Sequence, residues 1–258
     1  MESSFDRKVA LVTGAAHGIG RSICVELSKR GAVVWASDVL VDDLAETQRA
    51  CRDTGGRCHT RAFDVTDEEA VNSVVAEILT QEQRVDILVN VAGGVLGQTA
   101  KPLEEISGRD WNSIVAVNLT GTFYCCRAVA PAMKERQYGR IVNISSGAGR
   151  STSLTGIQAY TSAKAGQIGL TRQLAQELGP WGITVNTIAP GFVLSNPTTQ
   201  LQWESYGKDG QAGLVESIAL KRLGVAEDIA HGVLFFASDY AAWCTGQVLS
   251  IDGGKAMF

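Results

Sequence analysis

Apolar runs recur along the whole chain, and helical patterns fill most of the intervals between them. The runs are 8–14, 32–38, 57–65, 85–93, 139–146, 182–190 and 246–254. Most of them are near-continuous in Val, Ile and Leu, which is typical of strands that are buried on both faces. Strands that alternate with helices are joined by right-handed crossovers. The sequence therefore predicts an α/β fold of the Rossmann-like kind, a doubly wound parallel sheet with helices on both faces.

The domain organisation follows from length and from the absence of linkers. The chain has 258 residues, which suits one large α/β domain, and no Pro/Gly/Ser-rich linker or solenoid repeat divides it. We therefore predict a single domain over residues 1–258. The segment 195–220 breaks the alternation because it is long, polar and poorly periodic. Long irregular insertions of this kind are often lids over a binding site.

Charge and composition exclude several classes of protein. The net charge is -4 and no Lys/Arg run occurs, so a nucleic-acid or anionic-membrane surface is not expected. No uninterrupted apolar run of about 18 residues predicts a membrane span, and the first residues do not read as a signal peptide. The six cysteines include no C-x-x-C pair and the three histidines are scattered. We expect a cytoplasmic protein with reduced thiols and no metal centre.

A glycine-rich stretch, TGAAHGIG at 13–20, follows the first predicted strand and opens the first predicted helix. Its glycines are Gly14, Gly18 and Gly20, with His17 and Ile19 between them. Glycines without Cβ atoms allow a tight turn, and the N–H groups of a helix start can face a pyrophosphate. A purely structural turn is the alternative, because the spacing is G-x-x-x-G-x-G rather than the common G-x-G-x-x-G. The stretch predicts a dinucleotide-binding loop.

Asp38 strengthens this prediction because it ends the second predicted strand, 18 residues after Gly20. A carboxylate there can accept both hydroxyls of the adenosine ribose, and it would repel a 2′-phosphate. The alternative is an Asp that caps the next turn. Asp38 favours NAD over NADP. Ligands of such sheets lie at the carboxyl ends of the strands, and this adds further candidate cofactor residues, namely Asp64, Val65, Asn90, Ala92 and Gly93.

The stretch AYTSAKAG, 159–166, places Tyr160 and Lys164 four residues apart. On a helix this spacing puts both side chains on one face, with Cβ atoms roughly 5–6 Å apart. The pair could be an ordinary solvated one, or a phenol whose proton affinity the lysine alters. A dinucleotide site in the same chain favours the second interpretation.

These pieces together resemble the short-chain dehydrogenase/reductase family of single-domain type, over Lys8 to about Gly254. The resemblance rests on TGAAHGIG, Asp38, NVAG, VAVNLTG, IVNISS, YTSAK, VNTIAPG and GQVLSIDGG, in this order. It implies the catalytic set Asn118, Ser146, Tyr160 and Lys164, with Ser145 as the nearby competitor of Ser146. It also implies that Asn118 interrupts a long helix and holds a water. The cofactor residues that it adds are Pro190, Gly191, Val193 and Ser195, together with Tyr160 and Lys164.

The chemistry implied is the oxidation of an alcohol or the reduction of a ketone. A free tyrosine has a pKa of about 10, and a nearby ammonium favours the phenolate. We therefore expect Lys164 to lower the pKa of Tyr160, the acid/base, and Ser146 to donate to the reacting oxygen. The cofactor itself would carry the hydride.

The substrate is less sharply indicated. The expected pocket is largely apolar and suits a small, neutral alcohol or ketone that is apolar, cyclic or aromatic. Its predicted residues are Gly94, Val95, Ser146, Ile157, Tyr160 and Trp203. An NAD(P)H-dependent ketone or 3-oxoacyl reductase is the alternative activity, and a catalytically idle dinucleotide-binding regulator is the alternative of another class. The resemblance further implies a homo-oligomer, either a tetramer or a dimer.

Overall fold

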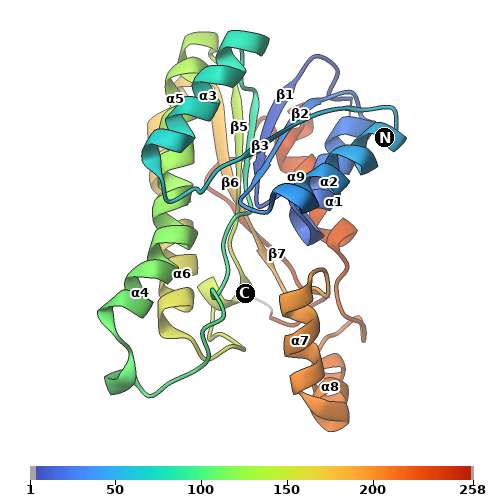
Figure 1. Ribbon diagram of the computed structural model, residues 1–258, viewed down its shortest axis with the longest axis vertical. Helices are drawn as coiled ribbons and strands as arrows, with labels where there is room; N and C mark the ends of the chain where they lie inside the picture. The colour runs from blue at the N-terminus through green and yellow to red at the C-terminus, as the bar shows by residue number, and fades with distance from the viewer. Residues whose placement is uncertain (1–3, 257–258) are drawn as a thin grey trace.

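The computed structural model describes residues 4–256 and contains one parallel sheet (Figure 1). Seven strands pair in the order β3-β2-β1-β4-β5-β6-β7. Their bounds are β1 Val9–Thr13, β2 Val33–Asp38, β3 Arg57–Ala62, β4 Ile87–Asn90, β5 Gly139–Ile144, β6 Ile183–Pro190 and β7 Val248–Ile251. All pairs between neighbours are parallel. The predicted α/β class is therefore confirmed.

Helices cover both faces of the sheet, with α1, α2 and α9 on one face and α3, α5 and α6 on the other (Figure 1). The α-helices are α1 Gly18–Lys29, α2 Val41–Asp53, α3 Glu68–Glu82, α4 Gly108–Val115, α5 Gly121–Arg136, α6 Gln158–Leu178, α7 Pro197–Ser205, α8 Gly207–Glu216 and α9 Ala226–Ala237. Short helices are η1 Leu103–Glu105, η2 Ala116–Thr120, η3 Gly147–Gly149, η4 Gly179–Trp181 and η5 Asp239–Ala241.

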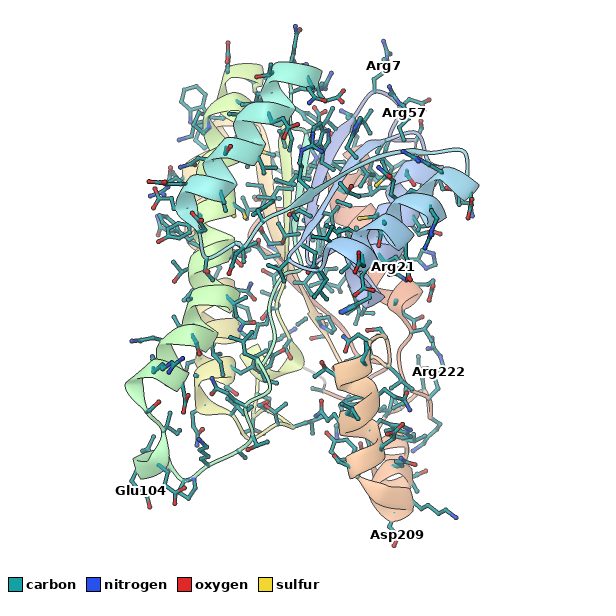
Figure 2. The ribbon with its side chains drawn as sticks, in the orientation of Figure 1. Arg7, Arg21, Arg57, Glu104, Asp209 and Arg222 are labelled. Carbon is teal, nitrogen blue, oxygen red and sulfur yellow. The ribbon has the colours of Figure 1, made fainter. Side chains whose placement is uncertain are left out.

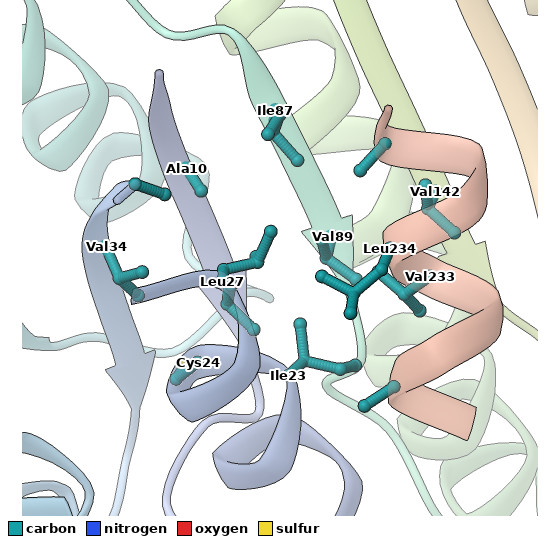
Figure 3. Close-up of a cluster of buried hydrophobic side chains, with 14 of the residues drawn as sticks. Ala10, Ile23, Cys24, Leu27, Val34, Ile87, Val89, Val142, Val233 and Leu234 are labelled. Carbon is teal, nitrogen blue, oxygen red and sulfur yellow. The ribbon is translucent and has the colours of Figure 1, made fainter. Parts of the chain in front are cut away.

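Two hydrophobic cores flank the sheet because successive strand residues point to opposite faces. Along β1, Ala10 and Val12 enter the core shared with α1 and α9 (Figure 3), whereas Val9 and Leu11 enter the core shared with α3 and α5. Each of these four side chains is at most 3% exposed. Burial on both faces explains why the strands have near-continuous apolar sequences.

The strand order changes direction between β1 and β4, which are adjacent in the sheet although two other strands lie between them in sequence. Chain connections leave to opposite faces at such a switch point, and a crevice forms outside the carboxyl ends of the strands. The glycine-rich stretch follows β1 and the NVAG stretch ends β4. The fold thus brings these two motifs to the same place.

One helical run within the described part of the chain, Gly108–Arg136, is long and apolar enough to cross a membrane by length and composition alone. It consists of α4, the π-helical η2 and α5. Cys125, Val129 and Met133 of α5 are at most 2% exposed and belong to one of the two sheet cores. The run packs against the sheet in the manner of a core helix.

The segment predicted as irregular is helical, because it contains α7 and α8. Asn196 caps α7 in a capping box with Thr199, and Pro197 occupies the first turn, which are strong helix-start signals. Neither helix contains a buried residue, so the sequence has no apolar stripe to reveal them. Both helices extend beyond the carboxyl edge of the sheet, with Asp209 at the far tip (Figure 2).

Candidate active site

Three glycines of the first loop are required by close backbone contacts. Gly14 has a φ of 64°, and a Cβ atom there would lie 2.6 Å from the Ala92 nitrogen. Gly18 has a φ of 57°, and its Cβ would lie 2.8 Å from the Ser195 carbonyl oxygen. A Cβ on Gly20 would overlap the Gly14 carbonyl. The loop is thus packed against the segments that follow β4 and β6, as a phosphate cradle at a switch point requires.

Side chains outside the motif hold this loop in shape. The Thr13 hydroxyl accepts hydrogen bonds from the Val91 and Ala92 nitrogens, both at 3.2 Å. The Thr47 hydroxyl, on α2, donates to the Ala15 carbonyl at 2.8 Å. Arg21 donates to the Ala16 carbonyl through Nε at 3.0 Å. Sequence reasoning did not identify Thr47 or Arg21 because nothing in their local pattern points to a loop far away in sequence.

His17 and Ile19 complete the loop in different ways. His17 is the N-cap residue of α1 with an extended backbone, and its side chain makes no capping hydrogen bond. Ile19 packs against the hydrophobic core under the loop. The N–H groups that open α1 therefore lie beside the His17 backbone at the carboxyl edge of β1.

Asp38 ends β2 and turns its carboxylate toward the glycine loop. Its Oδ2 accepts from the Ala16 nitrogen at 3.1 Å, and its Oδ1 accepts from the Val39 nitrogen at 2.8 Å. Oδ1 also accepts from the Leu40 nitrogen at 3.2 Å, so Oδ2 is the oxygen that keeps a second lone-pair direction for a ribose hydroxyl. Val39 and Leu40, which follow, are 59% and 43% exposed. The carboxylate and two exposed apolar residues thus border the glycine loop at the end of β2.

Three predicted cofactor residues turn their side chains to structural partners. Asp64 Oδ1 accepts from the backbone and the hydroxyl of Thr66, both at 2.8 Å. Val65 is 6% exposed and lies where a Cβ on Gly121 would contact it at 2.7 Å. Asn90 donates through Nδ2 to Asn143 Oδ1 at 2.8 Å within the sheet. Any contact of Val65 or Asn90 with a cofactor would therefore come from the main chain.

The residues after β6 form the opposite wall of the crevice. Pro190 ends β6, and Gly191 lies where a Cβ would be 2.7 Å from Asp252 Cβ. Val193 is 5% exposed and belongs to the core, so its side chain is turned away from the crevice. Ser195, which precedes α7, is the residue of this wall that approaches Gly18 most directly, since its Oγ is 3.0 Å from the position of a Gly18 Cβ.

Asn118 sits in the π-helical η2 and is 0% exposed. Its side chain clamps Gly94, because Nδ2 donates to the Gly94 carbonyl at 2.8 Å and Oδ1 accepts from the Gly94 nitrogen at 2.9 Å. A Cβ on Gly93 would lie 2.5 Å from Asn118 Oδ1 and 3.3 Å from Lys164 Nζ. Asn118 and Lys164 therefore converge on Gly93, in the segment that follows β4.

Lys164 is buried on α6, and Tyr160 is half-buried one turn before it. Lys164 Nζ donates to the Ile144 carbonyl at 2.8 Å and lies 5.8 Å from the centre of the Tyr160 ring. Burial lowers the pKa of Lys164 to about 7. The ammonium thus reaches the same strand end that carries the serine motif.

The surroundings of Tyr160 shift its pKa in opposite directions. Burial raises this pKa, and the hydrogen bond with the Ser146 side chain lowers it. Lys164 Nζ lies 5.8 Å from the centre of the Tyr160 ring, and an ammonium at about this distance favours the phenolate. The expectation that Lys164 lowers the pKa of Tyr160 therefore stays a prediction.

The two adjacent serines have different surroundings. Ser145 is 4% exposed and its hydroxyl donates to the Lys164 carbonyl at 2.8 Å, so it ties β5 to α6. Ser146 is half-buried, and its hydroxyl accepts from the Ala148 nitrogen at 3.1 Å. The Ser146 side chain also lowers the pKa of Tyr160, against the rise that burial causes. The geometry therefore favours Ser146 over Ser145 as the residue that meets a substrate oxygen.

The predicted substrate residues fall into two groups. Val95 and the Tyr160 ring pack on a small buried cluster made of Ile114, Ile157 and Ala159. Trp203 lies on α7, across this end of the molecule from α4 (Figure 1), and its ring is 6.1 Å from that of Phe192. The structure thus brings Val95 and Ile157 to the tyrosine and anchors Trp203 on the other wall.

This edge of the sheet has the arrangement of a nicotinamide-dependent oxidoreductase, and comparisons with known proteins agree. The family model described as short chain dehydrogenase matches residues 8–205. Among curated relatives, the (2S)-[(R)-hydroxy(phenyl)methyl]succinyl-CoA dehydrogenase subunit BbsD of Thauera aromatica is 38% identical over 256 residues, covering 97% of each chain. The cyclohexanol dehydrogenase of Rhodococcus sp. (strain TK6) is 37% identical over 261 residues, covering 96% of this chain and 95% of its own.

A solved structure gives the same result. The 3-oxoacyl-[acyl-carrier protein] reductase with bound NAD from Brucella melitensis superposes with a TM-score of 0.87 at 35% identity, covering 99% of this chain and 93% of the other. The chain belongs to the short-chain dehydrogenase/reductase family of oxidoreductases.

Proposed function

We propose that this protein is an NAD-dependent oxidoreductase that interconverts a secondary alcohol and a ketone, with Tyr160 as the acid/base. The observation that carries this proposal is the convergence of Asn118 and Lys164 on Gly93, with Tyr160 one helical turn before Lys164 on α6. Gly93 follows β4 at the switch point, where such sheets bind dinucleotides. When bound, the nicotinamide cofactor exchanges the hydride with the substrate.

The proton is handled by the chain's own residues. Tyr160 takes the hydroxyl proton of an alcohol, or returns it to the oxygen of a ketone. Ser146 donates a hydrogen bond to the same oxygen, where charge develops in the transition state. In the absence of substrate the same hydroxyl proton faces Tyr160, and it counteracts the rise in phenol pKa that burial causes. Lys164, whose Nζ donates to the Ile144 carbonyl, places its positive charge beside the site.

The preference for NAD is proposed from Asp38 and its neighbours. A 2′-phosphate beside this carboxylate would suffer like-charge repulsion. The next three residues, Val39, Leu40 and Val41, are exposed and uncharged, so they supply no compensating cation. Arg21 is held by the Ala16 carbonyl and by an ion pair with Glu46 at 3.1 Å. These contacts support binding of a cofactor with an unmodified adenosine ribose.

The substrate class that we propose is a small, neutral, apolar or cyclic alcohol. Support comes from the apolar surroundings of Tyr160, which include Val95, Ile114 and Ile157, and from the relative named cyclohexanol dehydrogenase. An NAD(P)H-dependent ketone or 3-oxoacyl reductase is the second candidate, because the solved structure from Brucella melitensis is named a 3-oxoacyl-[acyl-carrier protein] reductase. A catalytically idle dinucleotide-binding regulator is a third candidate. It would give no function to the pair formed by Tyr160 and Ser146.

We also propose a cytoplasmic homo-oligomer, tetrameric or dimeric. All six cysteines are free thiols, which suits a reducing compartment. Large apolar side chains are exposed around the edge strand β7, with Trp243 100%, Tyr240 60% and Leu249 40% exposed. Exposed apolar surface next to an unpaired sheet edge is the kind of surface that a second copy would cover.

The test is a titration of NADH and NADPH by cofactor fluorescence, followed by reduction of NAD⁺ and NADP⁺ with a panel of aliphatic, cyclic, aryl and thioester-linked alcohols. We expect tighter binding of NADH and faster turnover of free neutral alcohols. Asp38→Ala should reduce the preference for NADH over NADPH about tenfold or more, since loss of a charged hydrogen bond is worth about 1.5–3 kcal/mol. Asp53→Ala, at the exposed end of α2, is the matched control. Tighter NADPH binding by the unaltered protein would refute the cofactor assignment.

A further inference from the structure

A buried glutamine and a buried threonine connect α6 to the helical segment that carries Asn118. Gln167 and Thr122 are 0% and 3% exposed. Gln167 Nε2 lies 2.7 Å from Thr122 Oγ1, and Thr122 Oγ1 lies 3.0 Å from the Asn118 carbonyl oxygen. Gln167 is three residues after Lys164 and therefore on the same side of α6. A polar path thus runs from the helix of Lys164 to the main chain of Asn118.

The direction of each hydrogen bond is fixed by the chemistry of the groups. A carbonyl only accepts, so the single hydroxyl proton of Thr122 goes to Asn118. Thr122 must then accept from the amide Nε2 of Gln167, and the Oε1 of Gln167 faces the interior with no partner among residues 4–256. Apolar side chains of the same shape would avoid an unsatisfied acceptor. Stability alone therefore does not explain why this polar pair is buried here.

The segment that Thr122 supports is π-helical and departs from regular geometry. The Gly121 nitrogen donates to the Ala116 carbonyl, five residues back, and such bulges leave the hydrogen-bond ladder locally out of register. Leu119, the residue after Asn118, packs so closely on α6 that a Cβ on Gly166 would lie 2.8 Å from Leu119 Cδ2. The position of Asn118 relative to Lys164 thus depends on how this bulge sits against α6.

We propose that Gln167 and Thr122 are positioning residues for the reaction proposed above, and this inference rests on that proposed function. They hold the Asn118 main chain in register with Lys164, so that the Asn118 side chain keeps its two bonds to Gly94. Neither residue needs to touch cofactor or substrate. Both residues act through Asn118. We therefore expect their substitution to lower turnover and to leave cofactor affinity unchanged.

The test compares Thr122→Val, which removes the hydroxyl at constant shape, with Thr122→Ser, which keeps it. Gln167→Met is the second variant, because it leaves Thr122 in place and preserves side-chain length. Thr80→Val is the matched control, since the Thr80 hydroxyl also donates to the carbonyl four residues back, at 2.8 Å, but on α3 and away from the site. The measurements are hydrogen–deuterium exchange over residues 116–122, kcat, KM and the pH dependence of kcat.

We expect Thr122→Val and Gln167→Met to exchange at least fivefold faster over 116–122 and to lose at least tenfold in kcat. The KM for NAD⁺ should stay within twofold, and the pH midpoint of kcat should shift. Thr122→Ser should keep the exchange rate and the kcat of the wild type. Exchange and pH profile that match those of Thr80→Val would overturn the inference. A wild-type protein that fails to oxidise any alcohol would refute the proposed function. Exchange needs no turnover, so it would still show whether Thr122 and Gln167 hold residues 116–122 in place.

Discussion

The ammonium of Lys164 donates to the main-chain carbonyl of Ile144 at 2.8 Å, from a side chain that is 3% exposed. This bond joins α6 to the carboxyl end of β5, one residue before the two serines of the site. A buried lysine without a carboxylate partner loses hydration that a carbonyl only partly replaces. The pKa of Lys164 accordingly falls to about 7, and its charge becomes sensitive to pH near neutrality.

Lys164 should make the stability of the fold depend on pH. The unfolded lysine holds its proton up to its ordinary pKa of 10.5, whereas the folded one loses it above about 7. Between these pH values the unfolded state binds more protons, so the free energy of unfolding rises with pH. At about 1.36 kcal/mol per pKa unit, the penalty below pH 7 is on the order of 3–5 kcal/mol. Lys164→Met removes it.

Urea unfolding at several pH values measures this effect. Lys164→Met should exceed the wild type in unfolding free energy by the largest margin at pH 6–7. This margin should shrink by pH 10. Lys29→Met, at an exposed position of α1, serves as the control and should show a gap that is nearly independent of pH. A constant gap for Lys164→Met would mean that this lysine keeps its proton in the folded protein.

The adjacent serines should separate into one catalytic and one structural residue. Ser146→Ala removes a donor to the reacting oxygen and should lower kcat by about 10²–10³, with a small effect on the unfolding temperature. Ser145→Ala breaks the bond to the Lys164 carbonyl and should reduce the unfolding free energy by about 1–2 kcal/mol, with a smaller loss in kcat. Steady-state kinetics and thermal unfolding of both variants distinguish them. The reverse pattern would assign the substrate contact to Ser145.

Gly18→Ala should weaken cofactor binding and destabilise the loop. The φ of 57° costs a residue with a side chain about 1–2 kcal/mol, and the new methyl group would press on Ser195 at 2.8 Å. We expect at least tenfold weaker NADH binding in a fluorescence titration. Gly169→Ala on α6, where a Cβ meets nothing within 4 Å, should bind NADH normally and gain up to about 1 kcal/mol of stability. Unchanged affinity for Gly18→Ala would mean that the loop does not cradle the cofactor.

Features encoded by short-range pattern were predictable from the sequence. The buried strands have continuous apolar runs, and Tyr160 and Lys164 have helical spacing, so the confirmed fold class and the placement of this pair follow from local sequence. The helices α7 and α8 were not predicted, because neither has an apolar face and their start is marked only by Asn196 and Pro197. Capping signals in a polar segment are easily taken for loop residues.

Partners that come from distant parts of the chain were not predictable. The acceptor for Lys164 is a main-chain carbonyl 20 residues away, and Thr47 reaches the glycine loop from 32 residues away. A carbonyl has no identity in the sequence, so no pattern could point to Ile144. For the same reason the sequence placed Asn90 and Val193 at the cofactor without showing that their side chains turn into the sheet and the core.

The most direct test of the central claim compares turnover and cofactor binding in Tyr160→Phe. Removal of the phenol hydroxyl should lower kcat for the best alcohol by about 10²–10⁴, the range of a positioned acid/base, while the Kd for NADH stays within twofold. Tyr240→Phe, at a position 60% exposed, should keep the wild-type rate. A Tyr160→Phe variant that binds NADH and oxidises the alcohol at the wild-type rate would contradict the assignment of Tyr160 as the base.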